Sequence, residues 1–184
     1  MSTMLENARR MIAGDLPPAP MGTLIGLRLV SIEPGRARFE LDADQRHHNP
    51  MGTLHGGILC DIADSAMGMA YASTLEEGES FTTLELKINF LRPVRSARLV
   101  AEGTIVQRGR TAGMTECAVT DENGRLIAKA TSTCLTLRGD QAMTVNRRSY
   151  ISAWGLHGYV NLEQVFDPAR EPHRSQFAFS LSTR

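Results

Sequence analysis

Residues 54–71 read LHGGILCDIADSAMGMAY, and the fold of this chain depends on them. Apolar residues recur through this stretch at helical spacing, and no proline interrupts it. They would cover most of the surface of a helix, which is typical of a helix buried inside a protein. The pattern therefore predicts one long buried helix over residues 55–73.

The segments on either side change to a period of two residues, which is typical of strands with one buried face. Phe39 and Leu41 alternate with charged residues before the helix, and the apolar residues from Leu84 to Phe90 do so after it. We expect strands over residues 24–32, 37–41, 84–90, 99–107, 114–120 and 126–137. A parallel sheet needs a crossover helix between successive strands, and only one helix lies between the predicted strands here. The sequence therefore predicts an α+β fold in which an antiparallel sheet of five to six strands wraps around one long central helix.

The two ends of the chain differ from this middle part. Residues 3–13 carry apolar residues at helical spacing, and the proline-rich segment 16–20 ends that helix. We therefore divide the chain into an N-terminal helix and linker (1–20), the domain with the sheet (21–137) and a C-terminal tail (138–184). The tail has no sustained period, and we expect it to be weakly ordered or packed on a partner.

Composition restricts the partners and the compartment. Twenty basic residues balance twenty acidic ones, so no global field attracts nucleic acid or an anionic membrane. The longest nearly uncharged run, residues 58–74, is broken by two aspartates, and no apolar region of a secretion signal follows the N-terminus. The three cysteines (Cys60, Cys117 and Cys134) are odd in number and widely spaced, as in proteins of a reducing compartment. We expect a soluble cytoplasmic protein that binds neither membranes nor nucleic acid.

The start of the predicted helix has the features of a site that binds a carbonyl oxygen. Gly56 and Gly57 allow another molecule to approach the backbone closely. The first-turn amides of a helix have no partner within it, so they can stabilise an oxygen that becomes negatively charged. The alternative is that the two glycines only permit a tight turn or close helix packing.

Asp64 is the second candidate for chemistry, because acidic residues are rarely buried without a partner or a task. A carboxylate there can activate water as a general base or attack a carbonyl itself. A purely structural bond to a backbone amide is the alternative, and Asp61 competes for either role because it lies about one turn earlier.

The spacing of these groups has a consequence for assembly. Gly57 and Asp64 are about 10 Å apart along one helix at ~1.5 Å per residue. A reacting carbon must lie about 3 Å from both its nucleophile and its oxyanion donors. If both groups act on one carbonyl, they come from two antiparallel helices, and the protein is at least a dimer.

The run from Asn49 to Gly57 (NPMGTLHGG), followed by Asp64 to Gly68 (DSAMG), resembles the PaaI-type acyl-CoA thioesterases of the hotdog superfamily. The resemblance covers residues 21–137 and includes the segments 90–93 (FLRP) and 108–111 (RGRT). It implies a hotdog fold and an enzyme that hydrolyses an acyl-CoA thioester as a homodimer or homotetramer. It implies no cofactor, since CoA enters as part of the substrate.

The resemblance also implies roles for particular residues. Asp64 would be the base or nucleophile, Asn49 would place the water or the thioester, and the backbone of His55, Gly56 and Gly57 would polarise the carbonyl. Thr83 on the following strand would assist. The residues implied for the path of the CoA pantetheine and phosphates are Arg92, Arg95, Gly109, Arg110 and Thr111. An arginine suits phosphate because its guanidinium donates two parallel hydrogen bonds, although either segment could instead be a solvated strand end.

Several other interpretations compete with this one. The histidines His47, His48 and His55 match no common zinc spacing, so we expect no metal, and His55 is expected to fix its loop through a hydrogen bond. Cys60 has no histidine positioned to activate it. A hotdog hydratase or dehydratase would pair His55 with Asp64, and a non-catalytic module would bind acyl-CoA without turnover. An assay on a panel of acyl-CoAs separates these alternatives.

Overall fold

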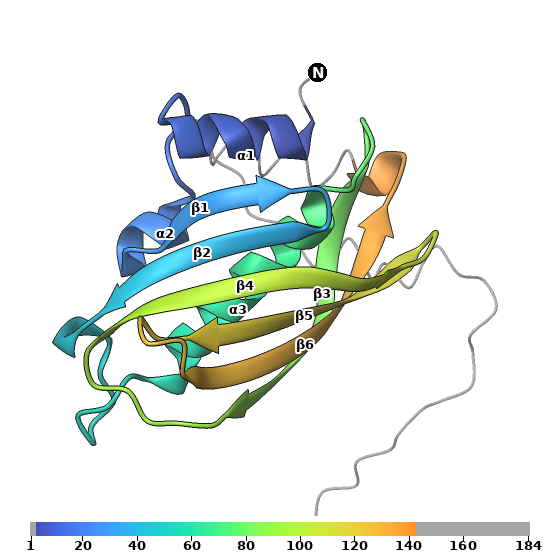
Figure 1. Cartoon of the computed structure of the whole chain (residues 1–184). Coiled ribbons are helices and arrows are strands. Elements are labelled where there is room, and N and C mark those ends of the chain that lie inside the picture. Colours follow the sequence, from blue (N-terminus) through green and yellow to red (C-terminus); the bar gives the residue numbers. More distant parts are fainter. Residues whose placement is uncertain (1–2, 143–184) are drawn as a thin grey trace, which may run out of the picture.

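A computed structural model describes residues 3–142 of the chain, and its centre is one helix held against a curved sheet (Figure 1). The helices are α1 (Met4–Ala13), α2 (Pro20–Ile25) and α3 (Gly56–Ala72), with a 3-10 turn at Gln45–His47. The strands are β1 (Arg28–Glu33), β2 (Arg36–Ala43), β3 (Ser80–Phe90), β4 (Ala97–Arg108), β5 (Ala112–Thr120) and β6 (Leu126–Leu137). Within the described residues all the strands join one sheet in the order β1-β2-β4-β5-β6-β3, and every neighbouring pair is antiparallel.

This architecture is the hotdog fold, and it confirms the predicted α+β class. The helix predicted over residues 55–73 is α3, and the strands predicted over 99–107, 114–120 and 126–137 lie within β4, β5 and β6. The predicted tail lies outside the described residues from residue 143 onward.

Helix α3 lies close against the sheet because the contact residues are small. Ala63, Ala66 and Ala70 are fully buried. Gly103 of β4 faces α3 so closely that a Cβ there would lie 2.3 Å from the carbonyl of Ala66. A side chain larger than hydrogen at Gly103 would therefore push α3 off the sheet.

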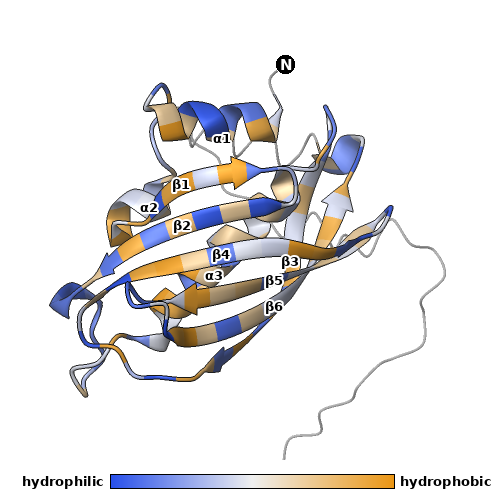
Figure 2. Cartoon of the chain, viewed as in Figure 1, coloured by the Kyte–Doolittle hydropathy of each residue, from blue (hydrophilic) through white to orange (hydrophobic). Residues whose placement is uncertain are grey.

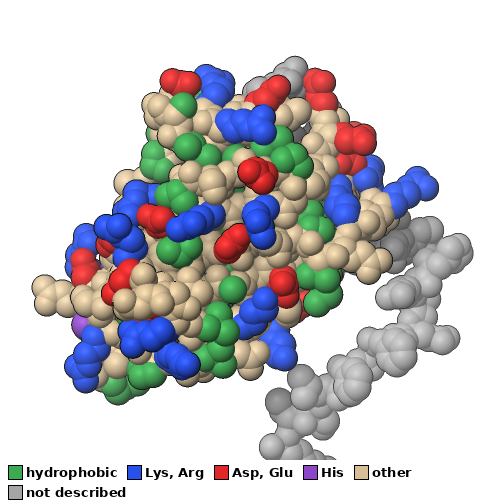
Figure 3. All heavy atoms as spheres, viewed as in Figure 1, with side chains coloured by type: hydrophobic (Ala, Val, Ile, Leu, Met, Phe, Trp, Pro, Cys, Tyr) green, Lys and Arg blue, Asp and Glu red, His purple; other side chains and the backbone are tan. Residues whose placement is uncertain are grey.

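The opposite face of the sheet carries charged side chains of both signs (Figure 3). Exposed ion pairs join neighbouring strands, such as Arg36 with Glu102 at 3.1 Å and Lys129 with Glu116 at 3.0 Å. Hydrophobic and hydrophilic residues alternate along β2 (Figure 2), and burial alternates with them, with Ala37, Phe39 and Leu41 buried. No helix among residues 3–142 is long and apolar enough to cross a membrane.

Two details of the predicted strands are wrong. Leu24 and Ile25 belong to α2, because Pro20 starts a short helix and Gly26 ends it with a φ of 75°. Leu84 does not point inward with Leu86 and the residues that follow. The register between β3 and β6 shifts between Thr83 and Glu85, which makes Leu84 the extra residue of a bulge, 57% exposed.

Candidate active site

The start of α3 is shaped by the side chain of His55. His55 is the N-cap residue, and its Nδ1 accepts a hydrogen bond of 2.9 Å from the amide of Gly57. The predicted hydrogen bond of His55 is therefore present, and it makes the two glycines unlike each other. Among the described residues no acceptor is found for the amide of Gly56, so this N–H is the one that remains for a ligand.

The loop before α3 is folded around the side chain of Asn49. Its Nδ2 donates to Oγ1 of Thr53 at 2.9 Å, and its Oδ1 accepts from the amide of Met51 at 2.9 Å. The amide of Asn49 also donates to the carbonyl of Thr53 at 2.8 Å. These bonds give the loop one shape and hold Asn49 close to the helix start.

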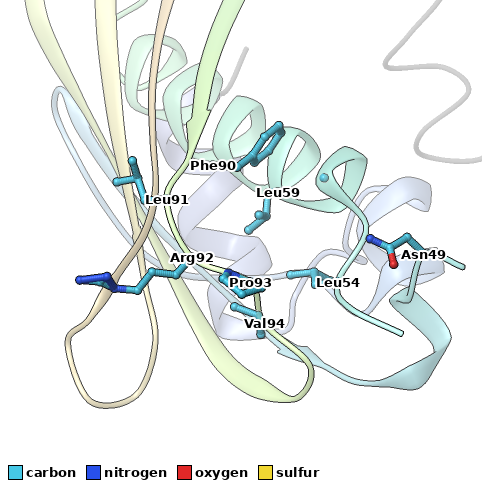
Figure 4. A pocket seen from close by; sticks show the side chains of 9 residues that line it. Asn49, Leu54, Leu59, Phe90, Leu91, Arg92, Pro93 and Val94 are labelled. Atoms are coloured by element: carbon cyan, nitrogen blue, oxygen red, sulfur yellow. The ribbon is translucent and has the colours of Figure 1, made fainter. Parts of the chain in front are cut away.

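Asn49 and Gly56 line the same pocket, with a volume of about 430 Å³ (Figure 4). Arg92 also lines it, so the structure brings three of the predicted site residues together. The remaining lining residues are apolar: Leu54, Leu59, Phe90, Leu91, Pro93 and Val94. We did not predict these apolar residues as part of the site. The segment 90–93 contributes four of the lining residues. This segment is the sequence signal from which the apolar walls Phe90, Leu91 and Pro93 could be predicted.

Asp64 and Thr83 form a second group. The hydroxyl of Thr83 donates to Oδ1 of Asp64 at 3.1 Å, across the space between β3 and α3. Burial raises the pKa of Asp64 above its usual value, and the hydrogen bond from Thr83 opposes that rise. The half-buried carboxyl therefore takes up a proton more readily than an exposed aspartate, as suits a general base.

The bulge at Leu84 places Thr83 on the inner face of β3. In a regular strand, Thr83 and Phe90 would point to opposite faces, because seven residues separate them and side chains alternate. The extra residue changes the alternation, so Thr83 reaches Asp64 while Phe90 reaches the start of α3. Two residues of the site therefore share one face of one strand.

Asp61 lies on another side of the helix start. With His55 and Gly57 it lines a separate hollow of about 410 Å³. Burial raises the pKa of Asp61, the charge of Asp64 raises it further, and His55 lowers it. The pKa of Asp61 is thus raised like that of Asp64, but Asp61 lines a different hollow from Gly56.

The histidines have separate structural contacts. Nε2 of His47 donates to the carbonyl of Ile25 at 3.0 Å, and Nε2 of His48 donates to the carbonyl of Arg95 at 2.7 Å. Within residues 3–142, no three histidine, cysteine, aspartate or glutamate side chains gather closely enough to hold a metal ion.

The residues expected along the CoA path form two groups at opposite ends of α3. Arg92 and Arg95 are exposed beside the helix start. Gly109, Arg110 and Thr111 form the turn between β4 and β5, next to the end of α3. There the guanidinium of Arg108 donates to the hydroxyls of Tyr71 and Thr136, which fixes that turn against the helix.

Known proteins are similar to this chain in sequence and in fold. The family model of the thioesterase superfamily matches residues 51–128. Proofreading thioesterase EntH of Klebsiella pneumoniae is 34% identical over 55% of this chain and 74% of its own length. The 1,4-dihydroxy-2-naphthoyl-CoA hydrolase of Listeria monocytogenes is 30% identical over 56% of this chain and 84% of its own. A thioesterase family protein from Silicibacter pomeroyi has a TM-score of 0.65 at 30% identity, covering 72% of this chain and 99% of that one.

The chain therefore belongs to the thioesterase superfamily, a class of thioester hydrolases with the hotdog fold. The predicted family and the predicted class of enzyme are confirmed.

Proposed function

We propose that this protein hydrolyses acyl-CoA thioesters at a site shared between two copies of the chain. One observation carries the proposal: Gly56, whose amide has no acceptor among the described residues, lines a pocket whose lining residues carry no carboxylate, while Asp64 lies further along the same helix. Eight residues of helix separate them by about 12 Å at ~1.5 Å per residue. Asp64 of a second, antiparallel copy can approach the carbonyl that Gly56 binds.

The amide of Gly56 stabilises the developing oxyanion in this scheme. It stands at the positive end of a 17-residue helix, so both its hydrogen bond and the helix dipole favour negative charge there. Asn49 lines the same pocket, and its tightly bonded loop holds it ready beside the thioester. His55 contributes by occupying the amide of Gly57, which leaves one donor in a defined direction.

Asp64 of the second copy supplies the carboxylate. As a general base it removes a proton from water, the hydroxide attacks the carbonyl carbon, and the C–S bond breaks. The thiolate of CoA leaves and takes up the proton that Asp64 held. As a nucleophile, Asp64 would instead form a mixed anhydride that water then cleaves. A single turnover in H₂¹⁸O identifies the nucleophilic route when water attacks the aspartyl carbonyl of the anhydride, because the first product then carries an aspartate ¹⁶O and the ¹⁸O enters Asp64, whereas the general-base route puts ¹⁸O into the product.

The CoA part of the substrate is supported by charge and by relatives. Arg92, Arg95 and Arg110 are exposed guanidinium groups that suit the phosphates of CoA. The Listeria relative is named for a CoA thioester. We also propose a cytoplasmic location, since all three cysteines are free thiols.

A hydrolysis assay on a panel of acyl-CoAs tests the proposal. The full-length chain should release free CoA from at least one ester with a kcat/KM well above that for the matching oxygen ester. The same acyl group on pantetheine should be a poorer substrate, because it lacks the phosphates. Binding of acyl-CoA with no release of thiol from any ester would contradict the proposal and favour a non-catalytic module.

A further inference from the structure

The pocket beside Gly56 has walls of two kinds. Leu54, Leu59 and Val94 belong to the buried core, with exposed fractions of 6%, 4% and 7%. Phe90 is different, because 54% of its surface is exposed although it lines the same pocket. The inner walls are therefore fixed by the core, and Phe90 is a wall that can change without disturbing it.

Phe90 also lies against the proposed oxyanion donor. A Cβ at Gly56 would lie 3.0 Å from Cζ of Phe90, so the end of the ring contacts the backbone that presents this amide. The backbone of β3 at Phe90 pairs with Ala128 of β6, and the amide of Leu91 donates to the carbonyl of Ile127 at 2.9 Å. The backbone that carries the ring is thus held by the sheet.

We infer that this pocket holds the acyl group of the thioester and that Phe90 determines the largest acyl group that it accepts. The inference rests on the proposed function, because it takes Gly56 as the group that binds the thioester carbonyl. Any acyl group bound there begins next to the ring of Phe90.

The chemistry of the pocket favours an acyl group over the pantetheine arm. Pantetheine carries two amides that need hydrogen-bond partners when buried. Asn49 bonds within its loop through Oδ1 and one N–H of Nδ2, so one N–H is left for the thioester and none for a second amide, and the side chain of Arg92 leads away from Leu54 and Leu59 (Figure 4). The inner walls offer only hydrocarbon. A volume of about 430 Å³ is at the small end of the ~300–1,000 Å³ range of ligand pockets, so a compact acyl group fits it.

The test compares acyl selectivity in the wild-type chain, Phe90→Ala and Phe90→Leu. The substrates share the same CoA and differ only in the acyl group, from acetyl through hexanoyl to benzoyl and naphthoyl. Val106→Ala is the matched control, because Val106 is an apolar β4 residue that is 53% exposed and does not line the pocket. Thermal unfolding of each variant verifies that the fold is kept.

Phe90→Ala should raise the ratio of kcat/KM for the bulkiest ester to that for acetyl-CoA by about 10-fold or more, as expected when a pocket wall is removed. Phe90→Leu should fall between it and the wild type, and Val106→Ala should leave the ratio unchanged. An equal factor for every ester would overturn the inference, because it would place Phe90 beside the common CoA part. Unchanged ratios in both Phe90 variants would overturn it as well. If the wild type cleaved no ester, the proposed function would fail instead.

Discussion

The hydroxyl of Thr83 on β3 donates a hydrogen bond of 3.1 Å to Oδ1 of Asp64 on α3. Among the described residues it is the one side-chain group that stabilises the Asp64 carboxylate, while burial acts against the charge. Thr83 therefore adjusts the protonation of the proposed base, and it does so from the strand whose bulge turns it inward.

Replacing Thr83 by valine should move the pH profile of the enzyme. Burial already raises the pKa of Asp64 above 3.8, so kcat/KM should begin to fall on acidification at a higher pH than for an exposed aspartate. Thr83→Val keeps the shape and removes the bond that lowers this pKa, so the acidic limb should move to still higher pH. The pH dependence of kcat/KM measures this. A limb that moves to lower pH, or does not move, would contradict the role of Asp64.

Asp64→Asn should abolish most activity while preserving the fold. Loss of a general base costs about 10²–10⁴-fold in rate, and Asp61→Asn should cost far less because Asp61 lines a different hollow. Because the folded pKa of Asp64 is raised, the wild type loses stability as the pH rises through that pKa, and asparagine has no such loss. The melting temperature of Asp64→Asn should exceed that of the wild type at pH 7, and the difference should shrink at acidic pH. An inactive Asp61→Asn beside an active Asp64→Asn would reverse the assignment.

The buried helix and the antiparallel sheet could be predicted because their signals extend over many residues. The helical period runs through all of α3, and Gly103 explains why so many alanines are needed on it. The bulge at Leu84 could not be predicted from period alone. Leu84 is itself apolar and continues the alternation of Leu86 and Ile88, so the local pattern hides the extra residue.

The sequence predicts which residues contribute to the site, but it does not predict how they are arranged in space. Gly56 and Gly57 are equivalent in the sequence, whereas in the structure His55 accepts from the Gly57 amide and Phe90 lies against Gly56. Histidine is not among the usual N-cap residues, so its acceptor role depends on a rotamer that the sequence does not specify. The contact of Phe90 with Gly56 joins residues far apart in the chain, and it depends on the same bulge.

The arginines should affect substrate binding more than chemistry. Phosphate contacts bind the ground and transition states alike, so Arg92→Ala, Arg95→Ala and Arg110→Ala should each raise KM by roughly 10-fold with little change in kcat. Acyl-pantetheine esters, which lack the nucleotide, should not distinguish these variants from the wild type. Arg36→Ala is the control, because Arg36 pairs with Glu102 on the opposite face of the sheet. An unchanged KM in all three variants would remove them from the CoA path.

Cys60 should lie close to its own copy in the dimer. A two-fold axis that brings Gly56 of one helix to Asp64 of the other passes nearest the residue halfway between them, which is Cys60. Cys60 is half-buried, whereas Cys117 and Cys134 are fully buried. A short bis-maleimide should therefore link two wild-type chains through Cys60. It should not link two chains of the Cys60→Ser variant. Burial and the charges of Asp61 and Asp64 raise the pKa of the Cys60 thiol, so the reaction should speed up at alkaline pH. A wild-type dimer that gives no linked chains would place the axis elsewhere.

Mixed dimers test the shared site directly. Gly56→Val adds a side chain that meets the ring of Phe90, so it should block the oxyanion pocket of its own chain but leave its Asp64 intact. Asp64→Asn has the opposite defect, and each variant alone should be nearly inactive. A dimer of one chain of each kind combines the intact Gly56 of the Asp64→Asn chain with the intact Asp64 of the Gly56→Val chain. It should recover one working site of two, or about half of the wild-type activity per dimer.

The two variants carry different affinity tags, so that mixed dimers are isolated by two purification steps and verified by native mass spectrometry. Mixing Asp64→Asn with Asp64→Ala provides the control, because no combination of those chains supplies the missing carboxylate. If Asp64 and Gly56 acted within one chain, the mixed dimer would have two defective sites and would stay as inactive as its parents. Recovery in the first mixture and none in the second is the outcome that the separation of Gly56 and Asp64 along α3 requires.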